Sequence, residues 1–402
     1  MEARHIAHGG IFQSFAGTFK ETTLACILDV GGLLAGFMIA IQLNIFDSTS
    51  WAIALYPAVI SVKAIITGLL TGRLNTALHL GTIYPRFFDN TKSFYKLIRA
   101  MIVLTLGTSA TISLIAMLFG TQFWGVTINE LPAILTVMVA TLSLGLIITL
   151  ITIKVTFISF KRSLDSDTIV YPAVSILANI VMTFIYIGVL NLYFSEGQWA
   201  LILFGLINVF LALFILPLNA RDKEFRQIIK EALPAILLVA LMVNITGTFL
   251  KGISNIVGNS KEIYTVYPAM IDMMGDAGLV VSSAATVKLT LGILSPTLGA
   301  IKNHAKNILS AWASTLILFG VLAGLSLAIN GIFTVEALSS LLLILLVSNV
   351  IAFTAIGLVP FVISILTFKH GLDPDNFVTP LVNALADALT TIALFIALLL
   401  LF

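Results

Sequence analysis

Long apolar runs separated by short polar segments cover nearly the whole chain. A helix needs about 20 predominantly apolar residues to cross a bilayer, and this criterion predicts eleven spanning helices. Their ranges are 22–43, 51–72, 98–120, 131–160, 166–194, 198–219, 233–255, 263–288, 307–330, 334–367 and 374–402. The second and the eighth are rich in glycine and small polar residues, so a broken or re-entrant course is an open alternative for both.

The composition leads to the same class of protein, an all-α polytopic membrane protein. Of the 402 residues, 59% are hydrophobic and 10% are charged, whereas about 25% of a soluble domain is charged. So few charges cannot cover a water-exposed surface, and the lipid bilayer is therefore the expected surroundings. The net charge of +2 argues against nucleic acid as a partner.

The distribution of Lys and Arg predicts an orientation, because basic residues are retained on the cytoplasmic side of a membrane. With a cytoplasmic N-terminus, the inner segments hold 17 of the 21 basic residues. The four exceptions are Lys63, Lys154, Lys251 and Lys261. We therefore expect a multi-pass protein of the cell (plasma) membrane, with its N-terminus in the cytoplasm and its C-terminus outside the cell.

Two pairs of segments repeat along the chain. Segment 56–81 aligns without gaps to 267–292, and segment 160–180 aligns to 368–388. Ten of the 21 positions in the second pair are identical, including two aspartates and a proline. Matched polar positions at matched spacing are rarely a matter of chance in apolar helices, so the repeats indicate two related halves.

The predicted halves are 1–197 and 220–402, each with five helices, and the helix at 198–219 links them. Six helices separate the start of one repeat from the start of the other, and an even number predicts parallel repeats about a pseudo-two-fold axis along the membrane normal. Facing repeats of this kind would form a central pathway between the halves. The fusion of the two halves also removes the need for a dimer.

The last helix of each half carries polar residues that would face the predicted axis. Asn383 and Asp387 are four residues apart and share one helix face, and the matching residues of the first half are Ser175 and Asn179. One carboxylate, two amides and a hydroxyl form an oxygen-only set, which suits hard cations such as Mg²⁺ or Ca²⁺. The alternative is that donors of a neighbouring helix bind Asp387.

The eighth predicted helix contains two acidic residues, Asp272 and Asp276, again four apart. Two carboxylates on one face repel each other, so either one is protonated or a cation lies between them. The alternative is a structural role, in which they pair with a base such as Lys63. Gly275 and Gly278 would let the backbone approach a ligand or another helix closely.

The first predicted helix contains Asp29, which is either a second ion ligand or a salt-bridge partner of Lys63. Four further aspartates lie at the cytoplasmic starts of the fifth and eleventh helices. Such residues commonly cap helix N-termini, although four carboxylates near one axis could also concentrate cations. These four are Asp165, Asp167, Asp373 and Asp375.

Three stretches carry a resemblance to a known family: PAVISVKAIITGLLTGRLNTALHLG, PAMIDMMGDAG and LDPDNFVTPLVNALADAL. Through them the chain resembles the MgtE magnesium channels and their double-repeat relatives, the eukaryotic-type solute-carrier magnesium transporters. The resemblance implies Mg²⁺ as the transported ion, no further cofactor and no enzymatic activity. It also implies an aspartate of each unit's last helix at the central site.

This chain departs from the family pattern at two places. The central aspartate of the second half is Asp387, but the matching residue of the first half is Asn179. The family's Gly-Asn pair in the second helix of the repeat reads Ala64-Ile65 in one half and Gly275-Asp276 in the other. We hypothesise that Asp276, Asp272 or Asp29 supplies the missing charge.

Three other functions are alternatives to divalent-cation transport. One is a secondary transporter of another ion or small solute, coupled to Na⁺ or H⁺. Another is an intramembrane aspartyl protease, but the Gly-x-Gly-Asp signature is absent because residue 273 is Met. The last is a scaffold subunit, in which the membrane aspartates would tolerate alanine.

Overall fold

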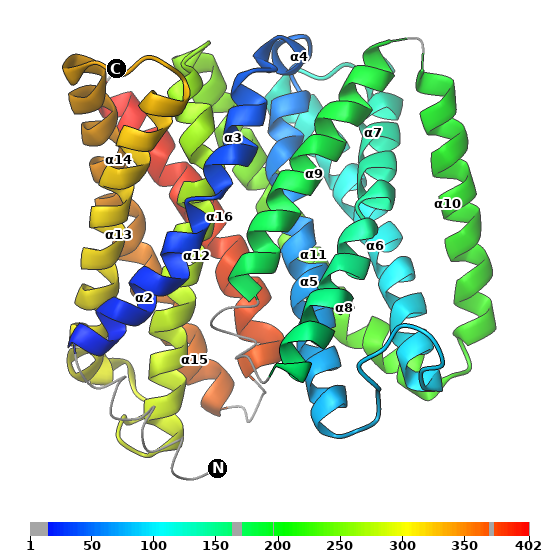
Figure 1. The fold of residues 1–402 in the computed structure, drawn as a ribbon. Coiled ribbons are helices and arrows are strands. Elements are labelled where there is room, and N and C mark those ends of the chain that lie inside the picture. Colours follow the sequence, from blue (N-terminus) through cyan, green and yellow to red (C-terminus); the bar gives the residue numbers. More distant parts are fainter. Residues whose placement is uncertain (1–14, 163–170, 196, 370–373, 402) are drawn as a thin grey trace. The chain divides into compact units, whose positions relative to one another are not determined.

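The computed structural model describes residues 15–162, 171–195, 197–369 and 374–401, and these are almost entirely helical (Figure 1). No strand occurs within those ranges. Eleven helical segments of the described chain are long and apolar enough to cross a bilayer. The predicted class, an all-α polytopic membrane protein, and the predicted number of spans are therefore confirmed.

The helices follow the predicted runs along the chain. Those of the first 219 residues are α2 (Phe15–Asp29), α3 (Gly32–Ala40), α4 (Leu43–Asp47), α5 (Ala52–His79), α6 (Lys92–Phe119), α7 (Leu131–Leu144), α8 (Ile147–Lys161), α9 (Tyr171–Phe194) and α10 (Gln198–Asn219). Those of the remainder are α11 (Lys223–Val257), α12 (Lys261–Thr290), α13 (Ile301–Ile329), α14 (Val335–Ile356), α15 (Val359–Lys369) and α16 (Pro374–Leu401).

The helices form two compact units. Unit 1 comprises Met1–Ala40 and Asn255–Phe402, and unit 2 comprises Ile41–Ser254. The first spanning helix, α2 with α3, thus belongs with helices of the second half, and α11 belongs with helices of the first half. Sequence repetition and compact packing are separate properties, so the repeat boundaries at 1–197 and 220–402 stay a prediction.

A glycine marks a close helix crossing in each unit. In unit 1, a Cβ at Gly36 would overlap the carbonyl oxygen of Thr265 on α12. In unit 2, a Cβ at Gly247 would overlap the carbonyl oxygen of Ala54 on α5. The two glycines are 211 residues apart in the sequence, and so are Ala54 and Thr265, whose carbonyls they meet. The same shift of 211 residues aligns segments 56–81 and 267–292. Small residues allow helix backbones to approach in membranes, so the same local contact recurs in both units.

The turns after α5 and α12 are also alike. Gly81 and Gly292 each have a φ of +69°, a conformation that residues with a side chain rarely adopt. The N–H groups of Gly81 and Gly292 donate to Leu78 and Leu289 respectively, each at 3.1 Å. The glycine that aligns at the end of the repeated segment is therefore required by the backbone of the turn.

Three spans are broken within the membrane segment, and they are not the expected ones. α5 and α12 are continuous helices, so the alternative of a broken or re-entrant second or eighth span is wrong. The breaks lie instead after Asp29, between α2 and α3, and at Gly145 and Gly357, which separate α7 from α8 and α14 from α15. At Gly145 and at Gly357, the glycine N–H donates to the carbonyl oxygen of the residue four positions earlier, in each case at 2.8 Å.

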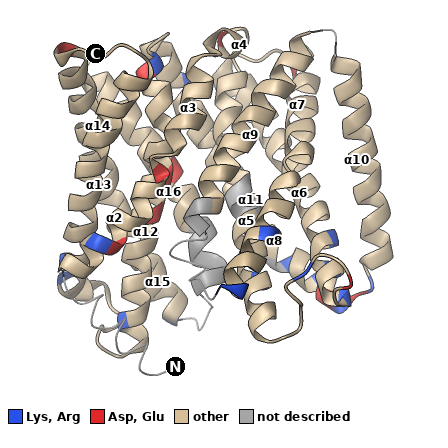
Figure 2. Cartoon of the chain, viewed as in Figure 1, with Lys and Arg blue, Asp and Glu red and all other residues tan. Residues whose placement is uncertain are grey.

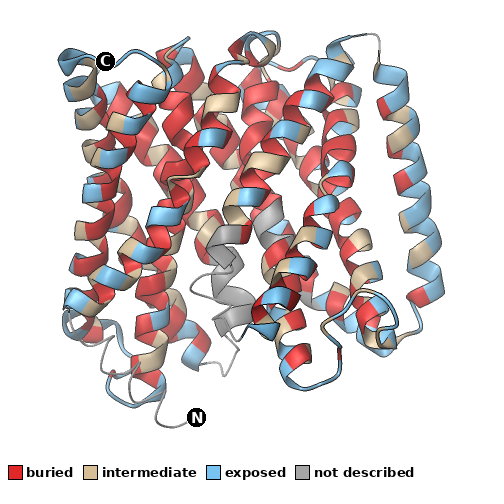
Figure 3. Cartoon of the chain, viewed as in Figure 1, coloured by how far each residue is buried: buried red, intermediate tan, exposed pale blue. Residues whose placement is uncertain are grey.

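The linking helix α10 is the most exposed span of unit 2 (Figure 3). Its buried residues are few: Leu201, Gly205, Asn208 and Asn219. The exposed remainder is dominated by large apolar side chains, such as Trp199, Phe210 and Phe214. Such a surface is stable in contact with lipid but not with water, and the role of α10 as the link between two halves stays a prediction.

Candidate functional site

Five of the seven candidate ion ligands belong to unit 1. Asp29 ends α2, Asp272 and Asp276 lie on α12, and Asn383 and Asp387 lie on α16. Figure 2 shows a group of acidic residues midway along the helices of this unit. The candidate carboxylates are therefore collected in one compact unit, although they are spread over the whole sequence.

Asp387 is a buried carboxylate, with 8% of its surface exposed. Asn383 lies one turn earlier on α16 and is partly buried. An ionisable group in a membrane span is costly unless it meets a polar partner or a water-filled route. The backbone beside Asp387 is fixed from within α16, because the Thr391 hydroxyl donates to the Asp387 carbonyl oxygen at 2.7 Å.

The helices α12 and α16 pack closely beside these residues. A Cβ placed on Gly275 would lie 3.0 Å from Asn383 Oδ1 and 3.9 Å from the Ala386 Cβ. A Cβ on Gly278 would lie 3.2 Å from the Val382 Cγ1. The expectation that these glycines permit close approach of another helix is thus confirmed, and that helix is the one that carries Asp387.

Asp272 and Asp276 are partly buried on α12. The helix α2 packs against this stretch, because the Cys26 thiol donates to the Met273 carbonyl oxygen at 3.4 Å. Cys26 is fully buried and lies within electrostatic range of both Asp29 and Asp276. The packing of α2 on α12 therefore places Asp29 and Asp276 near the same buried thiol.

The break after Asp29 is a feature that sequence reasoning missed. Asp29 is 1% exposed, and the Gly31 N–H beyond it donates to Leu28 at 2.9 Å. A Cβ on Gly32 would lie 3.0 Å from the Ala269 backbone of α12, so the second part of the helix starts against that helix. Discontinuous helices place backbone dipoles beside ion sites in many transporters. The run Val30–Gly32 after a membrane aspartate is the signal that could have indicated the break.

The remaining two candidates, Ser175 and Asn179, lie on α9 of unit 2. Asn179 is fully buried and Ser175 is partly buried. The expectation that their face opposes that of Asn383 and Asp387 stays a prediction. The side chain of Lys63, and all of Asp165, Asp167 and Asp373, lie outside the described residues, as does the side chain of Asp375.

Among the described residues, no group of three or more His, Cys, Asp or Glu side chains is arranged to hold a metal ion directly. The carboxylates of unit 1 are thus distributed along the helices rather than gathered into one cage. Mg²⁺ keeps several of its water molecules and commonly uses only one or two carboxylates. A distributed set of oxygen atoms suits an ion that retains its water.

A buried lysine at the end of the predicted helix 263–288 joins three helices of unit 1. Lys288 is 6% exposed, and its ammonium group donates to Asn307 Oδ1 at 2.6 Å. The Asn307 amide in turn donates to the Thr18 hydroxyl at 2.7 Å. This chain ties the end of α12 to α13 and α2. Lys288 therefore fixes the helices that carry the acidic residues.

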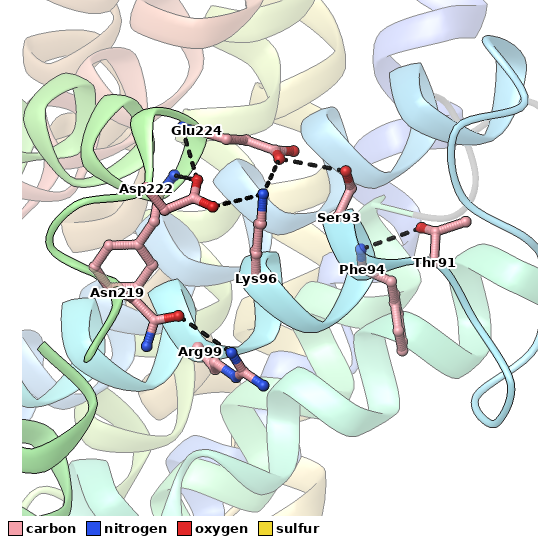
Figure 4. A network of polar contacts seen from close by, with 9 residues as sticks. Thr91, Ser93, Phe94, Lys96, Arg99, Asn219, Asp222 and Glu224 are labelled. Carbon is pink, nitrogen blue, oxygen red and sulfur yellow. Dashed lines mark hydrogen bonds and ion pairs between the residues drawn. The ribbon is translucent and has the colours of Figure 1, made fainter.

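Unit 2 has an ionic network at the end where α6 and α11 begin (Figure 4). Lys96 forms ion pairs with Asp222 at 2.7 Å and Glu224 at 3.2 Å, and Arg99 donates to Asn219 at 3.2 Å. The hydrogen bond from Lys96 is the main cause that lowers the pKa of the Asp222 carboxyl below its usual value of 3.8. These groups join α6 to the connection between α10 and α11.

The fold and the buried acidic residues together define a polytopic membrane transport protein. The family model for MgtE, described as a divalent cation transporter, matches residues 56–189 and 267–397, which is more than half of the chain. The chain therefore belongs to the MgtE family of divalent cation transporters, whose members are transporters or channels and not enzymes. Neither a curated protein nor a solved structure gives a significant match.

The two matches begin 211 residues apart, as the repeated segments do. This is consistent with the expected double-repeat form of the family. The family also gives no support to the alternative of a transporter for another ion or solute.

Proposed function

We propose that this chain carries Mg²⁺ across the cell membrane along a route that passes Asp387. The observation that carries the proposal is the buried carboxylate of Asp387 on α16, one turn from Asn383, which lies against Gly275 of α12. In a family of divalent cation transporters, a carboxylate buried inside a membrane span is a natural group to meet the ion, because such a group is costly unless it serves a polar partner or a water-filled route. The pathway between the two halves remains part of this proposal.

Mg²⁺ is preferred to a softer divalent metal because the candidate ligands are all oxygen atoms. Carboxylates, amide oxygens and hydroxyls bind Mg²⁺ and Ca²⁺, whereas zinc sites favour thiolates and imidazoles. Mg²⁺ is smaller and releases water reluctantly, so Asp387 would contact the ion through its water shell. Asp276, Asp272 and Asp29 lie in the same unit as Asp387 and would add negative charge along the route.

The orientation proposed from the sequence is supported by the ends of unit 2. The end formed by the starts of α6 and α11 carries most of the basic residues of this unit, including Arg86, Lys96, Arg99, Arg226 and Lys230. Basic residues flank spans on the cytoplasmic side. We therefore place this end, together with the N-terminus of the chain, in the cytoplasm, and the C-terminus outside.

The orientation is tested with single added cysteines, because native Cys26 is fully buried. A membrane-impermeant maleimide should label Asn129→Cys in intact cells, since residue 129 is exposed at the end of α6 opposite the basic one. It should label exposed Thr82→Cys only after the cells are opened. The reverse pattern would contradict the proposed orientation.

The transport proposal is tested by Mg²⁺ flux into proteoliposomes that contain the full chain. Asp387→Asn keeps the shape of the side chain and removes its charge, so flux should fall by at least about ten-fold. Asp222→Asn is the matched control, because Asp222 is partly exposed and lies outside the spans. Unchanged flux in Asp387→Asn would refute the role of this residue. Flux that requires a Na⁺ gradient would identify an exchanger, and flux without one a channel.

A further inference from the structure

A chain of hydrogen bonds connects α12 to the backbone of Asp387. The Tyr267 hydroxyl and Thr391 Oγ1 are 2.9 Å apart, and Thr391 Oγ1 donates to the Asp387 carbonyl oxygen at 2.7 Å. A threonine hydroxyl has a single proton, and here Asp387 receives it. Tyr267 is therefore the donor in the first bond, and the direction of the whole chain is fixed from Tyr267 to Asp387.

Both hydroxyl-bearing residues are inaccessible to solvent and lipid. Tyr267 is 2% exposed and Thr391 is fully buried. Hydrogen bonds in such surroundings are not exchanged for bonds to water, so they fix geometry more firmly than exposed ones. Thr391 binds the carbonyl of the residue four positions earlier, an arrangement that can bend a helix slightly. Tyr267 thus stabilises the local shape of α16 at the turn that begins with Asp387.

The same tyrosine–threonine bond occurs in unit 2. The Tyr56 hydroxyl and Thr183 Oγ1 are 3.0 Å apart. Tyr56 and Tyr267 are 211 residues apart, and Thr183 and Thr391 are 208 apart, which are the shifts of the two repeated segments. Thr183 follows Asn179 by four residues as Thr391 follows Asp387, so the same tyrosine–threonine contact lies one turn from an amide in unit 2 and one turn from a carboxylate in unit 1.

We propose that Tyr267 and Thr391 are positioning residues for the carboxylate of Asp387, and that they set how strongly it binds the hydrated cation. This inference rests on the proposed function of Asp387. Binding an ion through its water shell requires a carboxylate at a defined height and angle, because the water molecules of Mg²⁺ keep a near-octahedral geometry. A small rotation of the Asp387 turn would misplace those contacts.

The test compares Tyr267→Phe with Tyr56→Phe in proteoliposomes over a range of Mg²⁺ concentrations. Phenylalanine retains the ring and removes the donor. Tyr267→Phe should raise the half-saturating Mg²⁺ concentration about two- to ten-fold, the range expected for one lost hydrogen bond, with little change in maximal flux. Tyr56→Phe should cause a smaller shift, since Asn179 carries no charge to be positioned.

Substitutions of Thr391 separate positioning from folding. Thr391→Val removes both hydrogen bonds and should raise the half-saturating concentration as Tyr267→Phe does. Thr391→Ser keeps the hydroxyl and should restore the wild-type value. A purely structural role would instead lower the amount of folded protein and the maximal flux, and serine would not act differently on the affinity.

Three outcomes would overturn the inference: equal shifts in Tyr267→Phe and Tyr56→Phe, no shift in either, or a Thr391→Ser variant as impaired as Thr391→Val. If Asp387→Asn abolishes flux while Tyr267→Phe has no effect, the positioning role alone is wrong. If Asp387→Asn itself transports normally, the proposed function of Asp387 fails and takes the positioning role with it.

Discussion

The glycine at the crossing of α12 and α16 gives the sharpest test of the site. In Gly275→Ala, the new Cβ would lie 3.0 Å from Asn383 Oδ1, whereas ordinary van der Waals contacts of a Cβ begin at 3.4 Å. The amide must therefore move by about 0.4 Å, and we expect it to leave its preferred rotamer, because α16 is packed on both sides of it. The ligand next to Asp387 is displaced while the backbone stays in place.

The size of the effect follows from that displacement. Holding a side chain away from its rotamer costs about 0.5–1.5 kcal/mol, and 1.36 kcal/mol corresponds to ten-fold in an equilibrium constant. Gly275→Ala should therefore raise the half-saturating Mg²⁺ concentration for flux about two- to thirteen-fold. The helix itself should gain stability, because alanine is favoured over glycine in a helix interior by up to about 1 kcal/mol. The variant should thus be stable and weak in binding.

The assay is Mg²⁺ entry into proteoliposomes, followed with a fluorescent Mg²⁺ indicator inside them, together with the melting temperature in detergent. Gly324→Ala on α13 is the matched control in the same unit, because a Cβ there meets nothing within 4 Å. It should keep the wild-type concentration dependence and gain helix propensity as Gly275→Ala does, but without displacing a neighbouring side chain. If Gly275→Ala transports with wild-type affinity, Asn383 is not part of the ion site.

Two further predictions concern the packing and the ionic network. Gly36→Ala and Gly247→Ala should each destabilise the protein by about 3 kcal/mol, at the upper end of overpacking effects, because the new Cβ meets backbone that cannot rotate away. Equal melting temperatures for wild type and both variants would show that the helices do not cross as closely at these glycines as the structure indicates. Asp222→Asn should lower the melting temperature by more at pH 7 than at pH 3, because the lowered pKa of Asp222 stabilises the fold above the usual carboxyl value of 3.8 and this contribution is lost progressively as the pH falls and the carboxyl is protonated. A deficit of the variant that is the same at both pH values would show that the ion pair with Lys96 does not stabilise the fold.

The ends of several spans differ from the prediction, since α11 begins at Lys223 rather than at 233 and α2 at Phe15 rather than at 22. The number and approximate positions of the spans could be predicted from hydrophobic runs, because every helix that crosses a bilayer needs a similar apolar length. The breaks could not. Gly145 and Gly357 interrupt apolar runs in the same way as glycines that merely allow helices to pack, such as Gly36, and the sequence does not distinguish the two uses. The break after Asp29 is hidden for the same reason, since Gly31 and Gly32 could equally serve as packing residues.

The candidate site shows a similar division. Helical periodicity correctly placed Asn383 with Asp387 and Asp272 with Asp276, because spacing along one helix depends on the sequence alone. The contact of Gly275 with Asn383 depends on which helices pack together, and that is decided by tertiary structure. The packing of α2 on α12, which brings Asp29 towards Asp276, joins residues about 250 positions apart and has no local signal.

The helices α2 and α3 belong to unit 1, whose other helices come from the end of the chain, and this has a consequence for how the protein is made. During synthesis α2 and α3 enter the membrane first, yet the helix they pack against, α12, begins only at Lys261. Until then the first span must remain in the bilayer without its native partner, and unit 2 must wait for α11. Domains usually fold as contiguous units while the ribosome works. Here neither half of the chain contains all the helices of a unit, so a ribosome that stops at the linking helix leaves a fragment that has no complete unit to fold into.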